Sequence, residues 1–174
     1  MSLYRTHYST ELSSKDDGNE VSLAGWVEDI RNLGSIAFVI VRDREGTFQI
    51  TTFKKRHREI FDKLVTLTRE SVISVKGICK ANEKVRNGYE IIPNEIEVLS
   101  KAETPLPLGV VDKVSAELDT RLDNRFLDLR KPEVKAIFII RDAMIDEAKN
   151  FLRKEGFIEV HTPKIIASAS EGGT

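Results

Sequence analysis

Apolar and polar residues alternate along three consecutive segments near the start of the chain. The segments cover residues 21–27, 36–41 and 47–52, and the second is almost wholly apolar and β-branched. A period of two in Val, Ile, Thr and Phe, interrupted by short turns, is typical of β-hairpins. Gly25 inside the first segment predicts a bulge or a sharp bend. Three strands that bend this early predict the first half of a small closed barrel.

The pattern then becomes helical before it returns to strands. Apolar residues in 59–67 recur at helical spacing, so we expect a helix with one face on the barrel. Two further strands are predicted over 72–81 and 89–99, and Pro93 predicts an edge strand or a bulge in the last one because proline donates no ladder hydrogen bond. This order of five strands and one helix predicts an OB-fold, a five-stranded partly open barrel that binds oligonucleotides.

A change in composition follows the fifth predicted strand. Residues 102–109 contain two prolines and a glycine, which is typical of a linker. A long apolar stripe then predicts a helix from Pro132 to just before Gly156, followed by a short strand over 157–163 that ends in proline. The predicted fold class is therefore mainly β with appended α. We divide the chain into an OB-fold domain over 1–104, a linker or hinge over 105–131, and the start of a second domain over 132–174.

The composition is that of a chain that can form a core. Of its 174 residues 40% are hydrophobic and 32% are charged, with a net charge of −1, which excludes a disordered chain and a global basic field. The single cysteine, Cys79, excludes a disulfide framework, and its apolar strand predicts an inert thiol in a reducing compartment. No apolar run reaches the roughly 18 residues of a membrane helix, and no signal-peptide pattern is present, so we expect a cytoplasmic protein.

The sequence contains no nucleophile–base pair, metal cluster, dinucleotide fingerprint or phosphate-binding P-loop. The candidate surface is on the predicted barrel, where Phe38 lies in strand two, Gln49 in strand three and Arg31 just before strand two. An aromatic ring there can stack a splayed base, an amide can pair with a base edge, and a guanidinium can reach phosphate or base. Composition alone favours Phe38 as an ordinary core residue. The residues by themselves therefore leave open whether its ring lies in the core or stacks on a base.

Five short runs, spread over nearly the whole chain, are distinctive in combination. They cover residues 4–7, 25–27, 40–43, 122–130 and 156–163. Together they closely resemble the N-terminal part of the archaeal-type aspartyl-tRNA synthetases, which are class II enzymes. The last run and the helix before it are similar to class II motif 1, and residues 171–174 are similar to the mobile loop that follows. The run 122–130 separates the chain from asparaginyl and lysyl relatives better than the barrel does.

The resemblance implies that the OB-fold reads the anticodon of tRNA-Asp. By position, Phe38 is similar to the aromatic residue that stacks on the central anticodon uridine. The resemblance therefore implies an exposed, functional Phe38, whereas composition alone favours a core residue. Gln49 and Glu90 match the base-reading amide and carboxylate of the family, and Arg31 matches the basic residue beside them.

Four further positions take an expected role from the same resemblance. Arg86 and Glu28 match positions linked to the discrimination between tRNA-Asp and tRNA-Asn, although Glu28 is typical of neither type. Glu171 matches a residue that contacts the substrate aspartate, and Pro163 belongs to the motif 1 region that forms the homodimer interface.

The family reaction activates aspartate with ATP and Mg²⁺ and then transfers it to tRNA-Asp. The motifs that hold ATP and the adenylate are expected downstream of Thr174, so we expect the 174-residue chain to hold neither cofactor and to be inactive alone. Two other interpretations stay open. One is a stand-alone OB-fold module for single-stranded nucleic acid with an oligomerising helical tail, and the other is the related asparaginyl-tRNA synthetase.

Overall fold

The computed structural model describes residues 5–111, 116–163 and 165. The chain forms two compact units, Met1–Leu106 and Pro107–Thr174. The division lies close to the boundary that the proline-containing linker predicts.

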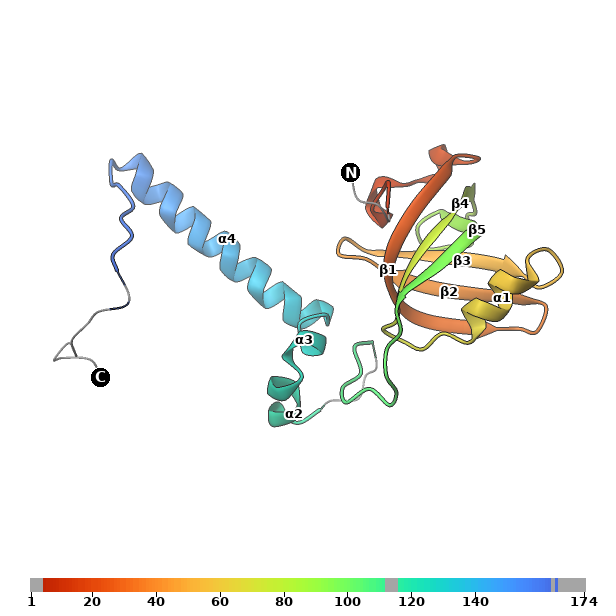
Figure 1. Cartoon of the computed structure of the whole chain (residues 1–174). Coiled ribbons are helices and arrows are strands. Elements are labelled where there is room, and N and C mark those ends of the chain that lie inside the picture. The colour runs from red at the N-terminus through yellow and green to blue at the C-terminus, as the bar shows by residue number, and fades with distance from the viewer. Residues whose placement is uncertain (1–4, 112–115, 164, 166–174) are drawn as a thin grey trace. The chain divides into compact units, whose positions relative to one another are not determined.

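The first unit is a closed five-stranded barrel with one helix (Figure 1). Its strands follow the order β1-β2-β3-β5-β4, and every pair is antiparallel except β3 with β5, which is parallel. The predicted OB-fold and its sequence of elements are confirmed. The elements are β1 (Glu20–Asn32), β2 (Ile36–Arg42), β3 (Thr47–Phe53), α1 (Arg58–Val65), β4 (Val72–Ala81) and β5 (Tyr89–Ser100).

Alternate residues of β2, β4 and the first part of β1 fill the barrel interior, as the alternating sequence pattern predicts. On β2 the buried positions are Ala37, Val39 and Val41, while the residues between them are only partly buried. Helix α1 adds Leu64 to the same core, which confirms that one helical face packs on the barrel. Cys79 of β4 is also fully buried in this core, and burial raises the pKa of its thiol to about 11.

Two glycines allow neighbouring backbones to approach closely where the strands bend. A Cβ on Gly25 would collide with the carbonyl group of Arg42, and a Cβ on Gly77 with that of Ile92. The predicted bulge in the first strand is confirmed, but the extra residue is Glu28, because the register with β2 shifts between Val27 and Asp29.

The strand position of Pro93 is explained by a second bulge. Pro93 pairs with Gly77, whereas the preceding pair joins Lys76 to Glu95, so one residue of β5 is extra. Strand β5 lies between β3 and β4 in the closed barrel and is not an edge. Of the two predicted explanations for a proline here, the bulge is therefore the correct one.

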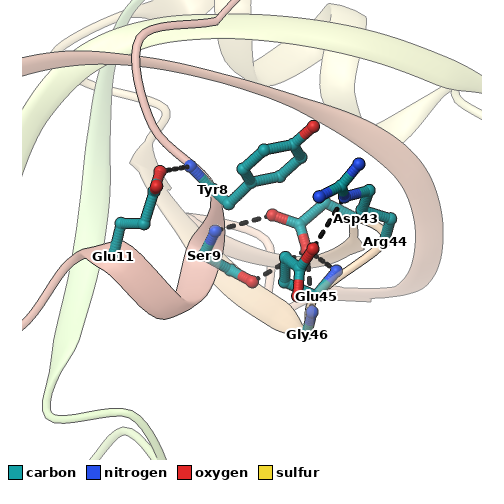
Figure 2. Close-up of polar contacts among 7 residues, drawn as sticks. All are labelled: Tyr8, Ser9, Glu11, Asp43, Arg44, Glu45 and Gly46. Carbon is teal, nitrogen blue, oxygen red and sulfur yellow. Dashed lines mark hydrogen bonds and ion pairs between the residues drawn. The ribbon is translucent and has the colours of Figure 1, made fainter. Parts of the chain in front are cut away.

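The segment before β1 is tied to the turn between β2 and β3 by one carboxylate (Figure 2). The Ser9 backbone N–H and hydroxyl donate to Asp43 at 2.6 and 2.9 Å, and the N–H groups of Glu45 and Gly46 each donate to it at 2.8 Å. The Tyr89 hydroxyl, whose pKa is raised by burial, donates to the Ser9 carbonyl at 2.7 Å. These bonds hold the first of two short 3-10 turns, Ser9–Glu11, against the barrel. The second turn, Ser14–Asp16, is followed by backbone hydrogen bonds of Gly18 and Asn19 with Cys79 of β4.

The second unit consists of helices α2 (Leu118–Asp123), α3 (Arg125–Asp128) and α4 (Pro132–Lys154). The predicted long helix is confirmed, with Pro132 in its first turn and Gly156 at a φ of 89° just beyond its end. The first two helices lie inside the segment predicted to be a linker. The fully buried side chain of Asp128 pairs with Arg121 at 2.9 Å and with Arg125.

The strand predicted over 157–163 is wrong, because these residues form no strand in the structure. A strand needs a neighbouring backbone for its hydrogen bonds, and no strand of the described part of the second unit supplies one. Instead, Glu159 pairs with Lys149 and Arg153 of α4 at 2.8 and 2.9 Å. The apolar side chains of this segment are exposed, with Ile158 at 87%.

Candidate nucleic-acid interface

The outer face of β1, β2 and β3 carries a groove of about 360 Å³. Strand register brings its residues into two rows, with Arg31 opposite Phe38 in one and Ile40 opposite Gln49 in the other. The loop between β4 and β5 closes one side of the groove. Its lining consists of Asp29, Arg31, Phe38, Ile40, Gln49, Asn82, Lys84 and Val85.

The bulge at Glu28 decides which residues of β1 face this groove. Before the bulge, odd-numbered residues such as Val27 point into the barrel. After it, Ile30 packs against the core, and Asp29 and Arg31 line the groove. Arg31 therefore lies inside β1, which continues to Asn32, five residues beyond the end of the alternating segment predicted from sequence.

Phe38 is half-buried and lies on the outer face of β2, because the core positions of this strand are its odd-numbered residues. The core assignment favoured by composition is wrong. Gln49 lies on the same outer face of the neighbouring strand β3, and both side chains line the groove. An aromatic ring and an amide are thus presented together on an accessible barrel wall.

Glu90 of β5 lies beside this pair and is connected to it by hydrogen bonds. Its carboxylate oxygen Oε2 accepts from the Thr51 hydroxyl at 2.5 Å and from Gln49 Nε2 at 3.2 Å. Gln49 Nε2 also donates to Thr51 Oγ1 at 3.1 Å. Sequence reasoning did not identify Thr51, although it is the next outward-facing residue after Gln49 on β3.

The loop between β4 and β5 contributes Asn82, Lys84 and Val85, which sequence reasoning also missed. The available signal was the OB-fold itself, since its loops flank the binding face. Arg86 belongs to the same loop and is exposed, but it is not part of the groove lining. The side chain of Asn87 donates to the Thr47 carbonyl, which ties this loop to β3.

Glu28 occupies a different environment from the groove residues. Its carboxylate pairs with Arg42 at 3.3 Å, and the same guanidinium pairs with the buried Glu70 at 2.7 Å. Pro163 lies exposed in the second unit. The predicted aspartate contact, Glu171, lies outside the described residues.

Within the described ranges, no group of three or more His, Cys, Asp or Glu side chains is placed to ligate a metal ion. Among the helices of the described residues, none is long and apolar enough to span a membrane.

Comparison with protein families assigns both parts of the chain. Residues 21–99 match the family described as OB-fold nucleic acid binding domain, and residues 117–174 match tRNA synthetases class II (D, K and N). An OBody bound to hen egg-white lysozyme matches 59% of this chain and 99% of its own, with 32% identity and a TM-score of 0.54. The OB-fold part of the chain is thus similar to a whole protein of that fold.

Longer relatives match nearly the whole chain. The aspartate–tRNA(Asp/Asn) ligase of Methanocaldococcus jannaschii is 56% identical over 98% of this chain, and the aspartate–tRNA(Asp) ligase of Pyrococcus abyssi is 53% identical over 99%. The chain spans only about two fifths of their length, 39% and 40% respectively.

A solved structure matches over a similar extent. The asparaginyl-tRNA synthetase of Pyrococcus horikoshii complexed with asparaginyl-adenylate has a TM-score of 0.85 and 32% identity, over 99% of this chain and 39% of its own. Both family matches and the ligase relatives agree with one assignment. The chain thus combines an OB-fold nucleic acid binding domain with a segment of the class II tRNA synthetases (D, K and N), and nearly its whole length is similar to aspartate–tRNA ligases.

Proposed function

We propose that the groove on β1, β2 and β3 binds the unpaired anticodon bases of tRNA-Asp. The observation that supports this most directly is the pairing of Phe38 and Gln49 on one open wall. The ring of Phe38 provides a stacking surface, and the amide provides hydrogen bonds to a base edge. Arg31 and Lys84 add positive charge at the groove, and their side chains can bind a phosphate or a base carbonyl oxygen.

Replacing Phe38 by alanine tests the proposal. Loss of one base–aromatic stack costs about 1–3 kcal/mol, so Phe38→Ala weakens binding of an RNA hairpin carrying the tRNA-Asp anticodon by roughly 5–150-fold. The matched control is Phe53→Ala, because Phe53 is an exposed aromatic residue of the same barrel that does not line the groove. Equal affinity of Phe38→Ala and the unmodified chain, with both folded, contradicts the stacking role.

The two rival interpretations give different binding profiles. A general single-strand module binds random RNA strands as tightly as the anticodon hairpin, whereas we expect at least a tenfold preference for the hairpin, equivalent to about 1.4 kcal/mol. Asparaginyl and aspartyl anticodons share their central base and differ at the third. A hairpin changed only at the third anticodon base therefore distinguishes a tRNA-Asp reader from a tRNA-Asn reader.

For the whole protein we propose ATP-dependent activation of aspartate and its transfer to tRNA-Asp, supported by the aspartate–tRNA ligase relatives. When bound, ATP would supply the adenylyl group for the aspartate carboxylate, with pyrophosphate as the leaving group, and Mg²⁺ would neutralise charge on the phosphates. We place this activity in the cytoplasm with its tRNA. Aspartate-dependent ATP–pyrophosphate exchange by the full-length protein tests the activity, and its absence contradicts the proposal.

We further propose that the second unit forms a homodimer through the region containing α4 and Pro163. Large apolar side chains of α4 are exposed, and burying them is worth about 25 cal/mol per Å². Light scattering should show a mass that rises with protein concentration, whereas a strictly monomeric species contradicts the proposal. The exposed side chains are Ile137, Phe138, Ile139, Ile140, Met144, Ile145, Phe151 and Leu152.

A further inference from the structure

Three hydrogen bonds determine how the amide of Gln49 is oriented in the groove. The Thr51 hydroxyl donates its one hydrogen to Glu90 Oε2 at 2.5 Å, so its lone pairs are left to accept from Gln49 Nε2 at 3.1 Å. Gln49 Nε2 also donates to Glu90 Oε2 at 3.2 Å. The two acceptors lie only 2.5 Å apart, so the amide nitrogen donates toward both of them from the same side. The amide oxygen, Oε1, accepts no hydrogen bond from any described residue.

The opposite orientation of this amide is unfavourable. An ionised carboxylate only accepts hydrogen bonds, so a flipped Gln49 would place its Oε1 against Glu90 Oε2 with no hydrogen between them. Thr51 and Glu90 are 2% and 7% exposed, so water has little access to compensate for the lost bonds. Gln49 therefore directs its nitrogen toward Thr51 and Glu90 and keeps its oxygen available to a base.

We propose that Thr51 and Glu90 are positioning residues that set the base preference of the groove by fixing Gln49 as a hydrogen-bond acceptor. This inference rests on the proposed anticodon-binding function. A base stacked on Phe38 must then offer an N–H group to Gln49 Oε1.

Uracil fits this arrangement because its imino N–H lies between two carbonyl oxygens. Arg31 and Lys84, the two cationic side chains of the groove lining, can donate to such oxygens. Cytosine has an acceptor nitrogen in place of the imino group, which would oppose the Gln49 oxygen. The groove therefore prefers uracil over cytosine at the stacked position, and this preference depends on the Thr51 hydroxyl.

The amide orientation can be observed directly, because Gln49 is the only glutamine in the sequence. A chain labelled with ¹⁵N in glutamine side chains gives a single NH₂ signal pair in an NMR spectrum. We expect the NH₂ signals of the unmodified chain to be shifted by hydrogen bonding, and the signals of Thr51→Val to move toward those of a free amide. Thr51→Ser keeps a hydroxyl and should restore the original positions.

The neighbouring threonine provides a matched control. Thr52 is 1% exposed on the inner side of β3, and its hydroxyl has no hydrogen-bond partner in the described part of the chain. Thr52→Val removes a hydroxyl one residue away without touching the Gln49 amide. It should leave the Gln49 signals and the base preference unchanged.

Binding measurements then test the consequence for recognition. Two RNA hairpins that differ only by uracil or cytosine at the central anticodon base are titrated with each variant. We expect Thr51→Val to reduce the preference for uracil by about fivefold to tenfold, which corresponds to one hydrogen bond. Thr51→Ser and Thr52→Val should retain the preference. Glu90→Gln replaces the carboxylate, which only accepts hydrogen bonds, and should lose the preference for uracil in the same way. It is the alternative test if Thr51→Val does not fold.

The outcomes separate the two proposals. If the unmodified chain binds neither hairpin above random RNA, the anticodon-binding function is refuted and this inference falls with it. If the unmodified chain binds and prefers uracil, but Thr51→Val and Glu90→Gln keep that preference and the Gln49 signals, the function stands and the positioning role is overturned.

Discussion

The carboxylate of Asp43 attaches the segment before β1 to the turn between β2 and β3, and its removal should lower the stability of the barrel. Asp43 accepts four hydrogen bonds and is 7% exposed. Two of them come from Ser9, which is buried, and the other two come from the turn at Glu45 and Gly46, where water can replace a lost partner (Figure 2). The cost of Asp43→Ala is therefore dominated by the two bonds to Ser9.

A hydrogen bond to a charged group contributes about 1.5–3 kcal/mol, and neighbouring bonds are not fully additive. We expect Asp43→Ala to lower the free energy of unfolding by about 3–5 kcal/mol, a large share of the roughly 5–15 kcal/mol that stabilises a typical domain. Asp43→Asn can retain the three bonds made to Oδ1 but sets its NH₂ group against the Ser9 N–H. About half the loss is expected for this variant.

Urea unfolding followed by tryptophan fluorescence measures these differences. Trp26 is the single tryptophan and lies in β1, so its emission reports on the barrel. With a slope of about 1.5 kcal/mol per M urea, Asp43→Ala should lower the midpoint by roughly 2–3 M. Glu45→Ala is the matched control, because its exposed side chain pairs only with Arg44 while its backbone N–H still reaches Asp43. A loss below about 1 kcal/mol for Asp43→Ala would refute the reasoning.

Two further predictions concern ionisable groups. Burial, with added repulsion from Asp16 and Asp17, raises the pKa of Cys79 from 9.0 to about 11, so the folded chain should not react with an aromatic disulfide reagent at pH 8 and should react once unfolded in urea. Rapid labelling of the Cys79 thiol in the folded chain would contradict the raised pKa. Because this pKa is higher in the folded state, its contribution to stability is complete below about pH 9 and is lost as the pH rises toward 11. A hydrogen bond from Arg121 lowers the pKa of Asp128, so its contribution to stability is present above the unfolded pKa of about 3.9 and is lost as the pH falls through the folded value. Asp128→Asn should speed amide hydrogen exchange in α2 and α3 at pH 6, and equal rates in variant and unmodified chain would contradict this.

Local alternation of apolar residues was sufficient to predict the barrel strands, because each strand has one face in the core. It failed at the end of β1, where Glu28 and Asp29 interrupt the period of two and the strand continues for three further residues. It also failed at 157–163, where the residue pattern is that of a strand but the described part of the second unit offers no neighbouring strand. Strand formation depends on a partner that a local pattern does not contain.

The candidate site was partly predictable for a related reason. Phe38 and Gln49 lie on adjacent hairpin strands, so a correct assignment of faces brings them together. Glu90 is 41 residues from Gln49 and reaches it through the pairing of β3 with β5, which closes the barrel. Only the family resemblance pointed to Glu90, and the role of Thr51 depends on a contact that forms after closure.

The extra residue at position 28 has a consequence for any variation of this face. This residue can be lost without exchanging the two faces of the strand, because Val27 inside, Asp29 outside, Ile30 inside and Arg31 outside would then alternate regularly. Such a deletion would remove the local bend and the added twist of the bulge. Libraries that diversify this surface can therefore vary the length of β1 at this one position and keep Arg31 in the groove.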